Sequence, residues 1–163
     1  MPILSLEIVS LINAHIPREQ SAHLAYHAVD LWADDMGYVG TQHWARKQAL
    51  DELDHRDKLQ HYLVKLGAKP VVPTGDAPPT AWADLPGMFE YVMGLEKTVT
   101  KSINEINAAA IAEGDGLTQE RMIFFTHEQR VSLGEIADIQ KFFKVYGTQG
   151  AALALIDKRI GKL

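Results

Sequence analysis

Apolar residues recur at helical spacing along nearly all of this 163-residue chain, and no stretch shows the strict alternation of a half-buried strand. This periodicity predicts an all-α fold in a single domain covering residues 1–163. Four long helices are expected, followed by a short fifth one, over residues 4–35, 41–66, 81–113, 117–146 and 149–160.

The breaks between these segments differ in kind. Residues 69–79 read KPVVPTGDAPP, and their four prolines make this connection extended and stiff. Such a connection can carry the chain along the whole length of a bundle, which is one known connectivity of four-helix bundles. The other breaks are short turns. They are marked by Gly37 and Gly40, by Gly67 as a C-cap, and by Gly114 and Gly116 before Thr118, the expected N-cap.

Composition excludes several classes of protein. The formal net charge of −5 argues against a nucleic-acid partner, because phosphate binding needs a basic excess. No apolar run approaches the roughly 18 residues of a membrane-spanning helix. The N-terminus is a poor secretory signal because Glu7 interrupts its apolar stretch, and the absence of cysteine rules out thiolate ligands. A cytoplasmic protein that binds cations is therefore expected.

One stripe per predicted helix, traced at alternating spacings of three and four, gives the core-facing seams of a bundle. The seams are Glu19, Ala22, Tyr26, Val29, Ala33; Ala45, Gln48, Glu52, His55, Leu59, Tyr62, Leu66; Phe89, Val92, Glu96, Val99, Ile103, Ile106, Ala110; and Met122, Phe125, Gln129, Ser132, Ile136, Ile139, Phe143. Polar groups interrupt every seam, yet none contains lysine or arginine. Because a buried carboxylate must be protonated, paired or metal-bound, these seams indicate a bound cation.

Glu52 and His55 form an E-x-x-H pair, whose spacing of three places both side chains on one helix face. Carboxylate and imidazole ligands suit iron or manganese and tolerate zinc. The motif is common by chance, and a lone seam glutamate usually reaches solvent. Together with Glu19 and Glu96 in two other seams, it predicts a metal site. The remaining histidines, His15, His23, His27, His43 and His61, are interpreted as surface or interface groups outside this site. His127 is also expected outside it, the alternative being a position beside the metal ligands.

These motifs resemble the non-haem ferritins of bacterial type. The matching pieces are Glu19 with Tyr26, DELDH at 51–55, LEKTVT at 95–100 with INE at 103–105, Glu128–Gln129, and the ending GAALALID at 150–157. The resemblance covers nearly the whole chain. It implies a ferritin-like four-helix bundle with one long crossover and a short fifth C-terminal helix. It also implies an iron-storing homo-oligomer, a shell of 24 subunits.

In this family the equivalent residues form a ferroxidase centre that oxidises Fe(II) with dioxygen or peroxide. The resemblance implies that Glu19, Glu52 and His55 hold one iron, that Glu52 bridges to a second iron at Glu96 beside Gln129, and that Tyr26 acts catalytically as an electron donor. Glu128 remains available for a third iron with Asp51. However, Val131 and Ser132 replace acidic residues of that third site, so two irons are expected. A haem is not expected, because Glu128 starts no second E-x-x-H.

The same resemblance and the sequence itself lead to three further expectations. Asp51, Asp54 and Asp57 match an acidic face that nucleates mineral, and Asp115 with Glu120 is a candidate ion entrance. Pro17 predicts a kink or break just before Glu19. If Pro17 displaced Glu19, the chain would instead be a structural shell subunit with weak oxidase activity. A di-metal enzyme acting on an organic substrate is a third reading.

Overall fold

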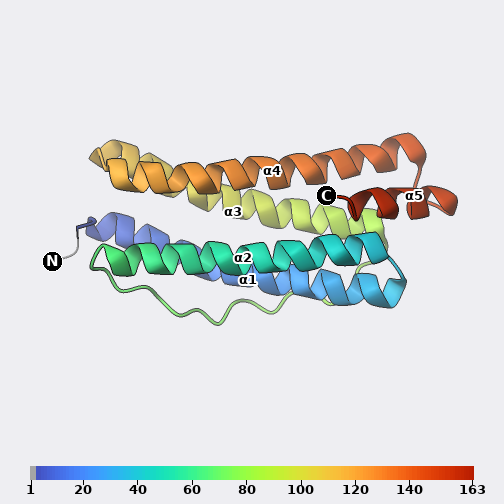
Figure 1. Ribbon diagram of the computed structural model, residues 1–163, viewed down its shortest axis with the longest axis horizontal. Helices are drawn as coiled ribbons and strands as arrows, with labels where there is room; N and C mark the ends of the chain where they lie inside the picture. Colours follow the sequence, from blue (N-terminus) through green and yellow to red (C-terminus); the bar gives the residue numbers. More distant parts are fainter. Residues whose placement is uncertain (1–2) are drawn as a thin grey trace.

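The computed structural model describes residues 3–163 and contains five helices. They are α1 (Leu6–Met36), α2 (Val39–Lys65), α3 (Leu85–Glu113), α4 (Gly116–Tyr146) and α5 (Ala151–Ile160). Helices α1 and α2 form one antiparallel pair and α3 and α4 another, and α1 also packs on α3 (Figure 1). Residues 3–163 include no strand, so the predicted all-α fold of four long helices and a short fifth is confirmed.

The connection from α2 to α3 runs the length of the bundle, as its prolines predict (Figure 1). It is fastened to α1 by hydrogen bonds. The Asn13 side chain donates to the Lys69 carbonyl over 3.0 Å and accepts from the Val71 amide over 2.8 Å, and Ser21 Oγ accepts from the Asp76 amide over 2.9 Å. The crossover makes α2 and α3 run in the same direction.

The core is built from the predicted seams. Every seam residue is buried except Leu66 and Ser132, which are partly buried. The core divides into two apolar clusters, one of which includes Tyr26, Trp44 and Phe89, and the other Ile16 and Phe125. Helical periodicity thus identified the buried faces correctly, because residues three and four apart share one side of a helix.

Pro17 lies inside α1, which continues unbroken from Leu6 to Met36. The predicted break before Glu19 is therefore wrong. A proline removes one backbone donor from a helix, at a cost of roughly 3 kcal/mol. Complete burial of Ile12, Ile16 and Ala22 on either side holds the helix together against that cost.

The predicted N-cap of α4 is also wrong, because Asp115 and not Thr118 occupies that position. The Asp115 carboxylate accepts hydrogen bonds from the amides of Leu117 and Thr118, both over 3.1 Å. A carboxylate caps a helix at least as well as a hydroxyl, and its charge also interacts with the positive end of the helix dipole.

Gly40, expected in the first break, lies in the first turn of α2 and receives α5. The Asp157 carboxylate of α5 accepts from the Gly40 amide, the Thr41 amide and the Thr41 hydroxyl, each over 2.8 Å. A Cβ atom at Gly40 would lie 1.8 Å from the Asp157 carbonyl oxygen. Only glycine permits this approach, so Gly40 is needed for α5 to fold back against the bundle (Figure 1).

Candidate metal centre

The polar seam residues meet in the middle of the bundle, one or two from each long helix. Glu19 comes from α1, Glu52 and His55 from α2, Glu96 from α3 and Gln129 from α4. All five are buried, with Glu19 and Glu96 fully excluded from solvent. The structure therefore brings together residues that are more than one hundred positions apart in the chain.

Glu19, Glu52 and His55 form the tightest group, in which one ligand atom from each residue lies within 4.8 Å of the others. His55 Nδ1 lies 3.2 Å from Glu52 Oε2 and 4.0 Å from Glu19 Oε2. Two carboxylate oxygens and one imidazole nitrogen thus face a common point, which is the ligand set expected for iron or manganese.

Glu96 lies beside this group, and hydrogen bonds hold both of its carboxylate oxygens. Tyr26 donates to Oε1 over 2.5 Å, and the Gln129 side-chain amide donates to Oε2 over 2.8 Å. The same Gln129 nitrogen lies 3.0 Å from Thr100 Oγ1, which it donates to as well. Tyr26 and Gln129 therefore position the carboxylate at which a second metal ion is expected.

The carboxyl groups carry perturbed pKa values because they are buried together. Burial, followed by the charge of Glu19, raises the pKa of Glu52 to about 8. Burial and the charge of Glu52 raise the pKa of Glu96 to about 7. The pKa of Glu19 is raised by burial as well. Near neutral pH the metal-free centre therefore retains protons that a cation would displace.

The pKa of His55 is also raised, but for a different reason. Burial alone would lower its pKa, but the hydrogen bond to Glu52 and the charges of Glu52, Glu19 and Glu128 outweigh burial and raise it to about 9. The rings of Phe124 and Phe125 meet His55 edge-on, with centroids 5.7 Å away in both cases. Glu128 approaches its other nitrogen at 3.8 Å and remains 36 % exposed, so it lies on the outer side of His55.

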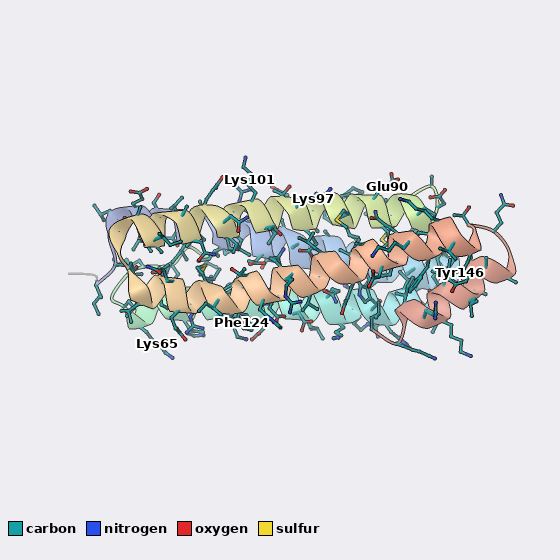
Figure 2. All side chains as sticks on the ribbon, turned by 90° about the horizontal axis from the view of Figure 1, so that it is seen from above. Lys65, Glu90, Lys97, Lys101, Phe124 and Tyr146 are labelled. Carbon is teal, nitrogen blue, oxygen red and sulfur yellow. The ribbon has the colours of Figure 1, made fainter. Side chains whose placement is uncertain are left out.

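The chemistry of these groups fits a bound metal ion. Among residues 3–163 no lysine or arginine is classed as buried, and no ion pair joins a lysine or arginine to Glu19, Glu52 or Glu96. Figure 2 shows Lys97 and Lys101, neighbours of Glu96 on α3, pointing away from the bundle. Glu19 Oε2 is buried without a hydrogen-bond partner. A buried acceptor without a partner is costly, and a metal ion at this point would satisfy it.

His15 was expected at the surface, and this expectation is wrong. It is fully buried, with Nε2 2.6 Å from Glu19 Oε1 and Nδ1 2.9 Å from Ser102 Oγ on α3. Burial lowers its pKa to about 4, so this contact is a hydrogen bond of a neutral imidazole rather than an ion pair. Its position four residues before Glu19 is the sequence feature that places both on one helix face.

The other histidines lie where the sequence placed them, outside the site. His27, His43, His61 and His127 are exposed, and His23 is partly buried with Nδ1 2.7 Å from the Ala49 carbonyl oxygen. The predicted acidic face on α2 is partly neutralised, since Asp54 pairs with Lys58 and Asp57 pairs with Arg56 at 2.7 Å.

Comparison with known proteins identifies the class to which this fold and site belong. The ferritin-like domain family matches residues 9–143, and the chain belongs to this family. It is 28 % identical to a bacterial non-heme ferritin of Bacteroides fragilis over 161 residues, covering 98 % of this chain and 99 % of the relative. A bacterial non-heme ferritin of Escherichia coli O6:H1 is 25 % identical over 161 residues, which are 99 % of this chain and 98 % of that protein.

Solved ferritin structures have the same fold as this chain. The open pore ferritin of the archaeon Archaeoglobus fulgidus superimposes with a TM-score of 0.91 at 26 % identity, over 97 % of this chain and 98 % of that one. The resemblance to ferritins that was predicted from the sequence motifs is thus confirmed. In the part of the chain that the structure describes, no helix is long and apolar enough to cross a membrane.

Proposed function

We propose that this chain is an iron-storage ferritin subunit that oxidises Fe(II) at a two-metal centre inside its own bundle. Family membership and fold support iron storage. The observation that carries the oxidase activity is the convergence of Glu19, Glu52 and His55 on one point, with a free Glu19 oxygen and no buried lysine or arginine among the described residues. The alternative of a spoiled centre rested on a kink or break at Pro17, and the continuity of α1 through Pro17 argues against it.

In this proposal the protein binds two ferrous ions as substrates. Glu19, Glu52 and His55 hold the first, and Glu96 with Gln129 holds the second, with Glu52 between them. Two adjacent ferrous ions together supply the two electrons of a two-electron reduction of dioxygen. The neutral imidazole and few protein ligands would leave open positions on the metals. In this proposal Tyr26, which donates a hydrogen bond to Glu96, serves as a further electron donor.

We further propose that identical chains assemble into a closed shell of 24 subunits, in which the oxidised iron is stored. Large apolar side chains remain exposed near both ends of the bundle, among them Leu6, Ile111 and Leu117 at one end and Val145 and Leu155 at the other. Surface apolar groups of this kind are commonly buried between subunits. The open pore named for the archaeal relative is a feature of an assembled particle.

Aerobic addition of Fe(II) to metal-free protein tests the oxidase activity, with ferric formation followed by absorbance. The double variant Glu52→Ala, His55→Ala should lose most of the rate. The matched control is Glu90→Ala, His43→Ala, which removes the same two residue types from exposed positions and should oxidise iron at the native rate. Equal rates for the native protein and the Glu52, His55 variant would refute the proposed centre.

Sedimentation of the native particle tests the shell separately. A closed shell of 24 subunits requires a particle mass near 24 times the 18.1 kDa of one chain. A dimer or a dodecamer at every iron loading would exclude it, whatever the outcome of the oxidation experiment.

A further inference from the structure

His15 and Ser102 form a fully internal hydrogen-bonded pair behind Glu19. His15 has no exposed surface and Ser102 only 6 %. His15 Nε2 lies 2.6 Å from Glu19 Oε1, and His15 Nδ1 lies 2.9 Å from Ser102 Oγ. The apolar cluster around the pair includes Ile12, Ile16 and Ile103. No surface charge or solvent contact explains a histidine at this place.

When Glu19 binds a metal ion it is ionised, and this determines which atom donates in each of the two hydrogen bonds of His15. A carboxylate can only accept, so His15 Nε2–H donates to Glu19 Oε1. The Nδ1 atom of the same neutral ring then accepts from the Ser102 hydroxyl. Both ring nitrogens then have a hydrogen-bond partner, and the tautomer of His15 is fixed. In many metal sites a similar hydrogen bond holds the metal-binding residue in its orientation.

The two oxygens of Glu19 therefore have different roles. Oε1 is occupied by His15, whereas Oε2 has no partner and lies 4.0 Å from His55 Nδ1, on the side of Glu52. Free rotation of the carboxylate would exchange them. The bond to His15 opposes any partial rotation, because that would leave His15 Nε2–H unsatisfied in an apolar interior. A half turn only exchanges two equivalent oxygens, so one oxygen always faces His15 and the other faces the centre.

The pair also ties α1 to α3 two residues before a proline. Pro17 lies between His15 and Glu19 and removes a backbone donor from this turn of α1. The contact from His15 to Ser102 anchors the turn laterally to α3, 87 residues away in the chain. Side-chain hydrogen bonds thus hold the geometry of the turn that carries Glu19.

We propose that His15 is a positioning residue of the metal centre, which holds Glu19 by Oε1 so that Oε2 alone is presented to the metal ion. The inference rests on the proposed centre and adds a residue to it. His15 itself does not touch the metal; it acts through Glu19. Loss of such a supporting hydrogen bond typically weakens metal affinity by about 10-fold to 100-fold.

Anaerobic titration of the metal-free full-length protein with Co(II) tests this role, since the visible spectrum of Co(II) reports both affinity and coordination. The variants are His15→Leu, His15→Gln and Ser102→Ala, with His43→Leu as a control at an exposed histidine. Leucine fills the space without a hydrogen bond, whereas the glutamine amide can donate to Glu19 and accept from Ser102. We expect His15→Leu to bind Co(II) at least ~10-fold more weakly with an altered spectrum, and His15→Gln to restore both.

Native affinity and spectrum in His15→Leu would overturn the inference, as would His15→Gln binding as weakly as His15→Leu. Should His15→Leu not assemble, Ser102→Ala decides, because it removes one hydroxyl and leaves the ring in place. A weaker affinity in that variant supports the chain of hydrogen bonds, and an unchanged affinity overturns it. Failure of the proposed centre itself has a different signature, in which native protein binds no more Co(II) than Glu52→Ala, His55→Ala; that result would overturn both.

Discussion

The metal-free protein should lose stability as the pH rises from about 6.5 to about 9. In the folded state the pKa of Glu52 is raised from 4.5 to about 8, and that of His55 is raised from 6.5 to about 9. Both groups therefore hold protons in the folded chain that the unfolded chain has released. A raised folded pKa contributes stability that is complete below the unfolded value and is lost as the pH passes the folded value.

The magnitude follows from the number of protons involved. At pH 7.5 the folded protein holds close to one proton on His55 and most of one on Glu52, whereas the unfolded chain holds almost none on either. Because each charge alters the pKa of the other, we expect one to two extra protons, which corresponds to about 1 to 3 kcal/mol per pH unit. His15, with its pKa lowered to about 4, acts in the opposite direction, mainly below about pH 7.

Thermal unfolding of chelator-treated protein at pH 6.5, 7.5 and 8.5, at constant ionic strength, measures this slope. Tm should fall by about 5 °C or more across the range, since 1 kcal/mol shifts Tm by roughly 2–4 °C in a domain of this size. The variant Glu52→Gln should show less than half of the native slope. Saturating Zn(II) without oxygen should raise Tm most at high pH, because the metal displaces the same protons. A Tm that is flat or rises with pH in the native metal-free protein would refute the reasoning.

Three further substitutions have definite expected outcomes. Pro17→Ala restores a backbone donor to α1 and should raise the stability of the protein by about 1–3 kcal/mol without weakening Co(II) binding, as measured by denaturant unfolding and titration. Tyr26→Phe removes the hydrogen bond that lowers the pKa of Glu96, so that pKa should rise further and Fe(II) oxidation should slow at pH 6 more than at pH 8. Gly40→Ala forces a Cβ atom against the Asp157 carbonyl and should release α5, costing about 1–3 kcal/mol and exposing residues after Tyr146 to limited proteolysis. An unchanged proteolytic pattern for Gly40→Ala, an unchanged pH profile for Tyr26→Phe, or a destabilised Pro17→Ala would each contradict the corresponding argument.

The buried polar positions of the candidate centre could be predicted from the sequence, because each depends only on which face of its helix a residue occupies. Glu19, Glu52, His55, Glu96 and Gln129 were identified because each is polar at a position where the helical period demands an apolar residue. That argument needs only the spacing within one helix, which is fixed by 3.6 residues per turn. The same argument passed over His15, although it lies four residues before Glu19 on the same face.

Contacts across helices were outside the reach of such reasoning. The partner of His15 is Ser102 on α3, and the partners of Asp157 are the first amides of α2. Neither pairing leaves a pattern in the local sequence. The prediction of a break at Pro17 was wrong for a related reason. The free-energy cost of a proline is local, but the burial of neighbouring residues that offsets it depends on the packing of the whole bundle.

The sequence by itself determined the four long helices, the stiff crossover, the buried faces and the surplus of carboxylates without a buried cation. These properties follow from local geometry and from the free energy of burying charge. Only the tertiary structure decided which oxygen of Glu19 is free, that His15 and Ser102 support it, and that Glu128 remains on the outer side of His55. The rotation and register of each helix against its neighbours set these contacts, and packing of the complete core fixes that rotation and register.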